Sequence, residues 1–113
     1  MRLFLLMMTL ASGAARAQNA LPQAQSLYDQ GHYEQAAAAY QKILKSDPRS
    51  AELQYNLGNA LFKAGQTGRA IASYQRAFDI RPRDGEVRQN LDFALRHTGE
   101  DLVPPGVPPL LFS

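Results

Sequence analysis

The sequence of 113 residues predicts an all-α fold of antiparallel helical hairpins, and three observations carry this prediction. The first is an internal repeat, because residues 51–82 restate a pattern that stands 34 positions earlier. The second is that turn signals separate helix-length segments by only a few residues, so neighbouring helices must run antiparallel. The third is the spacing of small and aromatic residues, which is typical of closely packed helices. The recurring pairs are Leu27 and Leu61, Gly31 and Gly65, Ala36 and Ala70, Ala38 and Ala72, Tyr40 and Tyr74, Gln41 and Gln75, and Pro48 and Pro82.

The first predicted hairpin joins helices at about 21–30 and 33–45. Gly31 ends the first of these, because glycine adopts the left-handed conformation that closes many helices. The second segment is rich in alanine and stops before Asp47-Pro48, since proline cannot continue a helix.

The second predicted hairpin joins helices at about 51–64 and 67–80. Ser50 is a suitable N-cap for the first, which ends before Gly65. Pro82 ends the second, as Pro48 does one repeat earlier.

A fifth helix is predicted at about 86–97, with Asp84 as its N-cap and Thr98-Gly99 as its end. Residues 99–113 then form a proline-rich extended tail, because their closely spaced prolines exclude a helix.

Within the second hairpin, three residues of one helix face three residues of the next. Small side chains at this seam allow the two backbones to approach closely, and the larger ones fill the remaining space. Gly58 is central, because a large residue there would overpack the contact. The two faces are Leu57, Gly58 and Leu61 against Ala70, Tyr74 and Ala77.

Residues 1–17 have the layout of a secretory signal peptide. Arg2 precedes a short apolar run at 3–11, and Ala15-Arg16-Ala17 supplies a cleavage pattern, so cleavage is expected after Ala17. The run is too short to span a membrane comfortably. An uncleaved anchor and a buried helix are the alternatives.

Cleavage would remove the excess of basic over acidic residues in the chain. The whole sequence has 12 Lys and Arg against 10 Asp and Glu, and the two arginines of residues 1–17 account for the difference, because 12 − 2 leaves 10 against 10. A neutral mature chain gives no basis for nucleic-acid binding, so no nucleic-acid partner is expected.

No catalytic, metal or cofactor site is expected. The chain has no cysteine, and its two histidines, His32 and His97, are not clustered with other ligands at the spacing of a metal site. Gly58, Gly65 and Gly68 lack the context of a phosphate loop, and no serine lies in a nucleophile-elbow pattern. An enzyme and a small-molecule substrate are therefore not predicted.

The repeating positions resemble those of the tetratricopeptide repeat, whose pattern begins W-x2-L-G-x2-Y. Repeat 51–84 carries much of this pattern but departs from it at Gln54, where a large aromatic residue is usual, and at Leu61, where tyrosine is usual. Repeat 17–50 is degenerate at its start, where Ala20, Gln23 and Ala24 stand at signature positions. The matching positions are Leu57, Gly58, Ala70, Tyr74, Ala77 and Pro82 in the second repeat, and Ala36, Tyr40 and Pro48 in the first.

This resemblance implies a tetratricopeptide domain at 18–98, built as a short α-solenoid of two repeats and a capping helix. Residues 55–71, together with 82–102 and the proline-rich segment, more narrowly resemble the BatE-type proteins of a bacterial aerotolerance operon. That likeness implies a periplasmic or envelope-associated protein, secreted across the inner membrane and part of a membrane-associated complex. The membrane-spanning parts of those proteins have no counterpart here.

In this family the first helix of each hairpin lines a concave groove that binds a protein or peptide partner. By position, the candidate binding residues are Tyr55, Asn56, Asn59, Phe62 and Lys63 in the second repeat and Gln89, Asn90 and Phe93 in the fifth helix, with Glu52, Arg96 and His97 beside them. Amide side chains pair with main-chain groups, and aromatic rings anchor apolar side chains. The alternative is that the aromatic residues only pack the core.

The resemblance also allows one known class of ligand, a peptide with a free C-terminal carboxylate, to be checked against the sequence. Tetratricopeptide clamps that hold a C-terminal carboxylate use Lys, Asn, Asn, Lys and Arg at five positions, and only Asn56 fits here. The other four positions hold Leu21, Gln25, Glu86 and Asn90. A carboxylate clamp is therefore not expected.

The sequence thus predicts a non-catalytic adaptor that binds a partner protein through its groove. The alternative is a structural piece that self-associates or stabilises a larger assembly, because two and a half repeats fall short of the three usually needed for stability.

Overall fold

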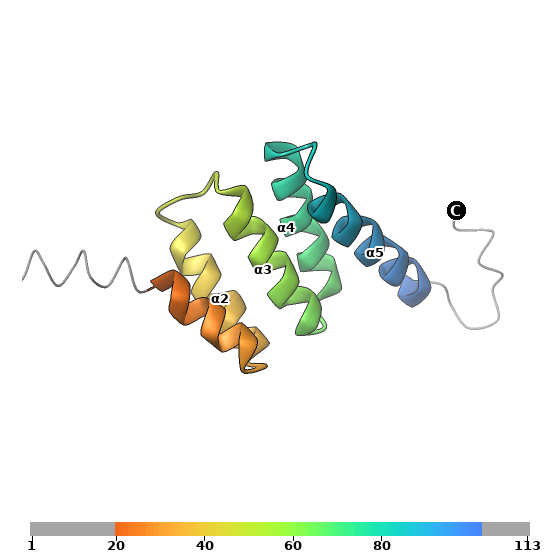
Figure 1. The fold of residues 1–113 in the computed structure, drawn as a ribbon. Helices are drawn as coiled ribbons and strands as arrows, with labels where there is room; N and C mark the ends of the chain where they lie inside the picture. The colour runs from red at the N-terminus through yellow and green to blue at the C-terminus, as the bar shows by residue number, and fades with distance from the viewer. Residues whose placement is uncertain (1–19, 103–113) are drawn as a thin grey trace, which may run out of the picture.

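The computed structural model describes residues 20–102, with side chains described to residue 98. In this range the chain folds into antiparallel helices stacked side by side, with no strand (Figure 1). The first helix covers residues 20–29. It is followed by α2 (Tyr33–Leu44), α3 (Ala51–Lys63), α4 (Thr67–Ile80) and α5 (Gly85–Leu102). The all-α prediction is confirmed. The signal peptide predicted at 1–17 lies outside the described residues, as does most of the tail.

The turns that join the helices of each hairpin are built alike. Gly31 and Gly65 both have φ +83°, the left-handed region that favours glycine. In each turn two backbone bonds satisfy carbonyls at the end of the helix. Gly31 N–H donates to Tyr28 O and Gly65 N–H to Phe62 O, both at 3.0 Å, while His32 N–H donates to Leu27 O and Gln66 N–H to Leu61 O, both at 2.9 Å. The repeat of the sequence is therefore also a repeat of backbone hydrogen bonds.

The predicted N-caps are confirmed. Ser50 Oγ accepts the Leu53 N–H at 3.1 Å, and Asp84 Oδ1 accepts the N–H groups of Glu86 and Val87 at 3.0 and 3.3 Å. Each side chain satisfies helix-end donors that have no partner within their own helix.

The predicted end of the fifth helix at Thr98-Gly99 is wrong, and so is an extended tail that begins at residue 99. Helix α5 continues to Leu102. A single glycine inside a helix costs only about 1 kcal/mol relative to alanine, and the first residue that excludes a helix is Pro104. The other helix ends lie within a residue of their predicted positions.

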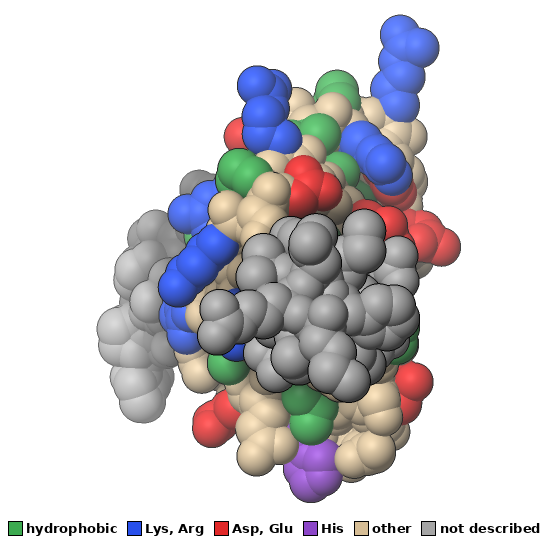
Figure 2. All heavy atoms as spheres, turned by 90° about the vertical axis from the view of Figure 1, so that its left-hand side faces the viewer, with side chains coloured by type: hydrophobic (Ala, Val, Ile, Leu, Met, Phe, Trp, Pro, Cys, Tyr) green, Lys and Arg blue, Asp and Glu red, His purple; other side chains and the backbone are tan. Residues whose placement is uncertain are grey.

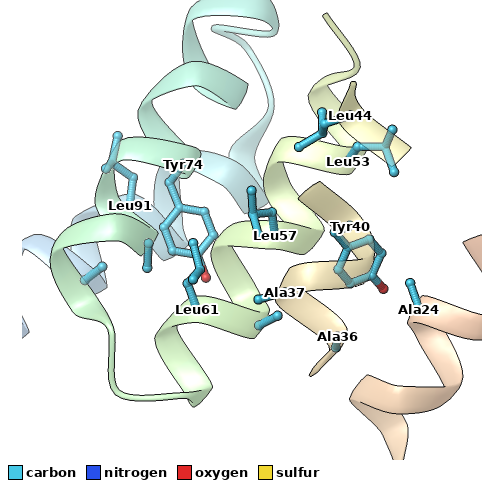
Figure 3. Close-up of a cluster of buried hydrophobic side chains, with 13 residues drawn as sticks. Ala24, Ala36, Ala37, Tyr40, Leu44, Leu53, Leu57, Leu61, Tyr74 and Leu91 are labelled. Carbon is cyan, nitrogen blue, oxygen red and sulfur yellow. The ribbon is translucent and has the colours of Figure 1, made fainter. Parts of the chain in front are cut away.

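The core runs through the whole stack between the helices (Figure 3). Tyr40 and Leu61 are 1% exposed and Tyr74 is 2% exposed, so the large side chains are fully enclosed. Gly58 lies directly against the Tyr74 ring, which confirms the close contact predicted between α3 and α4. Buried alanines, among them Ala24, Ala36 and Ala37, complete the core beside these larger side chains.

Helix α5 packs on α4. It differs from α3 at two positions that are equivalent by the 34-residue repeat. Asp92 stands 34 residues after Gly58, and Leu95 stands 34 residues after Leu61. Leu61 is 1% exposed beneath α4, whereas Leu95 is 48% exposed. A carboxylate where the preceding repeat needs a glycine opposes the docking of another helix of the α4 type.

The described surface carries mixed charge. Figure 2 shows the end of the array formed by the first hairpin, where positive and negative side chains are interspersed. Among the helices of the described range, none combines the length and apolar character needed to cross a membrane.

Candidate functional site

A hollow of about 360 Å³ opens beside α3 and is lined by four helices. We call it the central hollow. Its lining is mostly aromatic and amide side chains, and among its described lining residues Lys63 alone carries a charge. It is lined by Tyr28 from the first helix, Tyr55, Asn59, Phe62 and Lys63 from α3, Tyr74 from α4, and Asn90 and Phe93 from α5.

Two asparagines and two tyrosines of this lining form a hydrogen-bonded amide network. The Tyr74 hydroxyl donates to Asn59 Oδ1 at 2.6 Å, and Asn90 Nδ2 donates to the same oxygen at 3.1 Å. Asn90 Nδ2 also donates to the Tyr55 hydroxyl at 3.0 Å. The network therefore ties α3 to α4 and α5 within the lining of the hollow.

The network fixes the orientation of both amide groups. Because Asn59 Oδ1 accepts two hydrogen bonds, the Asn59 amide is turned so that its Nδ2 is left for other partners. Within the described residues, neither Asn59 Nδ2 nor Asn90 Oδ1 has a side-chain or backbone partner. Asn59 and Asn90 are half-buried, so the Asn59 Nδ2 donor and the Asn90 Oδ1 acceptor are accessible to a ligand at the same site.

Burial raises the pKa of Tyr74 above its ordinary value of 10.0, and the neighbouring Tyr55 and Tyr28 add to the effect. Burial likewise raises the pKa of Tyr28, with a further contribution from Tyr33. The Tyr74 hydroxyl is consequently a neutral, protonated donor throughout the physiological range of pH.

Aromatic side chains form one end of the central hollow. Phe62 meets Phe93 edge to face with ring centroids 5.6 Å apart, and His97 stacks on Phe93 at 6.2 Å. Phe93 is 54% exposed, which is a large fraction for a phenylalanine. Phe62 and Tyr55 are partly buried and pack against the core. Phe62 and Tyr55 thus contribute partly to the core, as the alternative interpretation holds, whereas the exposed ring of Phe93 does not fit that interpretation.

A second hollow of about 250 Å³ lies at the other end of α3, beside the loop between α4 and α5. Tyr55 lines both hollows, and we call the two together the groove. The second hollow is rich in carboxylates. Its lining is Ala51, Glu52, Tyr55, Asn56, Arg81, Asp84, Glu86 and Val87.

The structure brings most of the predicted binding residues together. The central hollow gathers Tyr55, Asn59, Phe62, Lys63, Asn90 and Phe93. Asn56 lies in the second hollow instead, and Gln89 is exposed on α5 and lines neither.

Two lining residues, Tyr28 and Tyr74, were not among the predicted binding residues. Tyr28 stands 34 positions before the predicted binding residue Phe62, so the repeat could have predicted its place in the lining. Tyr74 was predicted only to pack, and its ring does so while its hydroxyl reaches the amide network.

Within the described part of the chain, no three side chains of His, Asp and Glu gather in a way that could hold a metal ion.

Comparison with known proteins identifies the fold. The family model of the tetratricopeptide repeat matches residues 21–85, which is more than half of the chain. None of the curated proteins matches the sequence.

Two solved structures of MamA are similar to this chain. A MamA mutant has a TM-score of 0.70 at 25% identity, over 88% of this chain and 56% of that one. MamA AMB-1 also has a TM-score of 0.70 at 25% identity, over 84% and 56%. This chain thus spans just over half the length of the MamA chains. The match of the family model, together with this common fold, shows that the chain belongs to the tetratricopeptide repeat family.

Proposed function

We propose that this chain binds an extended segment of a partner protein in the groove beside α3. The observation that carries the proposal is the amide network, which holds in one hollow a donor on Asn59 and an acceptor on Asn90 that have no partner among the described residues. Tetratricopeptide repeat proteins bind protein partners, and the family match supports an interaction module of this kind.

The chemistry of the network suits a peptide backbone. An extended peptide offers a C=O and an N–H at each residue, and each is a strong hydrogen-bonding group. Asn59 Nδ2 can donate to the carbonyl and Asn90 Oδ1 can accept from the N–H. Because both amides are already held by Tyr74 and Tyr55, little side-chain freedom is lost on binding.

The aromatic end of the groove supplies apolar anchorage. Phe93 is half-exposed beside Phe62, so an apolar side chain of the ligand would remove ring surface from water. Burial of this kind is worth about 25 cal/mol per Å² of apolar surface. The fold is typically a non-catalytic scaffold, and we propose no reaction for it.

The proposed location is the bacterial cell envelope. It is supported by the signal-peptide pattern of residues 1–17 and by the resemblance to BatE-type proteins, which also makes a membrane-associated complex the proposed setting. Mass spectrometry of the protein purified from a bacterial envelope fraction tests the signal. A mature N-terminus at Gln18 is expected, and one at Met1 would contradict it.

The binding test compares two equivalent positions. Asn59→Ala removes the centre of the amide network, whereas Gln25→Ala removes the acceptor of the Tyr40 hydroxyl one repeat earlier, outside the groove. Capture of envelope proteins by the full chain should be lost with Asn59→Ala and retained with Gln25→Ala. Asn56→Ala reports on the second hollow in the same assay.

Equal loss of capture for Asn59→Ala and Gln25→Ala would point to general destabilisation and not to the groove. The size of the purified chain in solution distinguishes the alternative function, self-association, from the adaptor function. An obligate dimer that buries the groove would replace the adaptor proposal with the structural one.

A further inference from the structure

Charged side chains of opposite sign stand at the two ends of the groove. The second hollow holds the carboxylates of Glu52, Asp84 and Glu86 against the single guanidinium of Arg81. The central hollow holds Lys63 as its one charged lining residue within the described chain. The groove therefore changes from negative to positive along α3.

The acidic end has two carboxylates available for a ligand. Asp84 is engaged as the N-cap of α5, through bonds from the Glu86 and Val87 N–H groups. Glu52 and Glu86 are exposed, and neither takes part in an ion pair among the described side chains. A cationic side chain placed in this hollow would meet both.

The basic end lies beside the aromatic residues. Lys63 is exposed in the last turn of α3, next to Phe62 and across from Phe93. An anionic side chain there would meet the ammonium group. A ligand side chain one or two positions from it, on the side toward the acidic end, would meet the rings.

The distance between the ends fixes the spacing that a ligand must have. Glu52 and Lys63 are 11 residues apart on one helix, which corresponds to about 16 Å at ~1.5 Å per residue. An extended peptide advances ~3.3 Å per residue, so about five residues cover that distance.

We propose that the groove selects an extended, bipolar segment of the partner, with Lys or Arg at the acidic end, Asp or Glu about five residues away at Lys63, and an apolar residue between them. This specificity rests on the proposed function, since it assumes that the groove binds a peptide. The charge complementarity of the two ends carries it.

The test uses capped synthetic peptides of about nine residues with the full chain. One set has Lys and Glu separated by five positions with leucine between, in both chain directions. A second set has the same residues separated by two positions, and a third has glutamine in place of both charges. Binding is followed by the side-chain amide signals of Asn59 and Asn90 in NMR spectra and by titration.

The five-residue spacing, in at least one direction, should bind about two- to tenfold more tightly than the glutamine peptide, as expected for one or two exposed ion pairs. The advantage should shrink in about 0.5 M salt, because salt screens exposed charges. Lys63→Glu should abolish it and favour a peptide with Lys at both ends. Lys42→Glu is the matched control, because Lys42 is exposed in the last turn of α2 and away from the groove.

Two results would overturn the proposal in distinguishable ways. Equal affinity for all peptide sets, unchanged by Lys63→Glu, would remove the charge selectivity and leave peptide binding intact. The absence of any shift of the Asn59 and Asn90 amides at millimolar peptide would remove peptide binding itself, and the selectivity with it.

Discussion

A Cβ atom on Gly58 would lie 2.6 Å from two ring carbons of Tyr74, Cδ1 and Cε1. The ring is 2% exposed and held between α3 and α4, so it has little room to move away. This contact sets how closely the two helices of the second repeat approach.

The Gly58–Tyr74 contact predicts the effect of enlarging the glycine. Gly58→Leu should lower the free energy of unfolding by about 1–3 kcal/mol, because a packed seam must open. Urea unfolding followed by circular dichroism measures this. Gly68→Leu is the control, because Gly68 is also helical and a Cβ atom there would meet no neighbouring atom within 4 Å. Equal unfolding of Gly58→Leu and the parent would show that the assigned contact does not determine stability.

A buried amide in α3 predicts a stabilising substitution. Gln54 is 8% exposed, and its Oε1 has no hydrogen-bond partner in the described structure. Gln54→Leu should raise the free energy of unfolding by about 1–3 kcal/mol, because the unpaired oxygen no longer has to be desolvated. The control is Gln89→Leu, since Gln89 is exposed and a surface change is expected to stay within about 0.5 kcal/mol. A loss of stability in Gln54→Leu would contradict the free-energy cost assigned here to the unpaired oxygen.

Two equivalent tyrosines predict unequal effects of losing a hydroxyl. Tyr74 donates to Asn59 Oδ1 at 2.6 Å, and Tyr40 donates to Gln25 Oε1 at 3.3 Å, in each case 15 residues back. Tyr74→Phe should lower the free energy of unfolding by about 1 kcal/mol, and Tyr40→Phe by less, because its bond is longer. Thermal melts of the two variants compare them directly. The order would be reversed if the amide network contributed nothing to stability.

The raised pKa of Tyr74 predicts a loss of stability in alkali. Burial disfavours the phenolate, so the unfolded chain loses this proton first, at its ordinary pKa of 10.0. The stabilisation is fully present below pH 10 and is lost as the pH rises from there toward the pKa of the folded state. Tyr28 and Tyr40, whose pKa values are also raised by burial, add to the same loss.

Urea unfolding at a series of pH values from neutral to strongly alkaline measures this dependence. Tyr74→Phe should flatten the decline in stability above pH 10 without removing it, since Tyr28 and Tyr40 remain. An identical decline in Tyr74→Phe and the parent would assign the whole effect to the other tyrosines.

Local chemistry made most of the fold predictable from the sequence. Gly31, Gly65, Ser50 and Asp84 act through their own turns and caps, so their positions identify helix ends without knowledge of the rest of the molecule. The end of α5 was missed because a lone Gly99 is only a weak signal against a helix.

The groove was less predictable, because it depends on how helices pack. Asn56 and Asn59 are one helical turn apart, yet they line different hollows. The bond from Asn90 to Tyr55 joins residues 35 positions apart, and only the placement of α5 on α4 brings them together. Gln89, the neighbour of Asn90, lines neither hollow for the same reason. Family position predicts which helices line a groove, but not which side chains turn into it.

The aspartate at position 92 has a consequence for protein engineering. Repeat arrays are commonly lengthened by inserting further copies of one unit, and each added helix must pack its tyrosine against the preceding helix. On α5 that packing is blocked, because Asp92 occupies the position that Gly58 leaves free on α3. Asp92→Gly, followed by a grafted copy of α4, is the smallest change that would let α5 accept a further helix of this type. The exposed Leu95 would then be covered, as Leu61 is now.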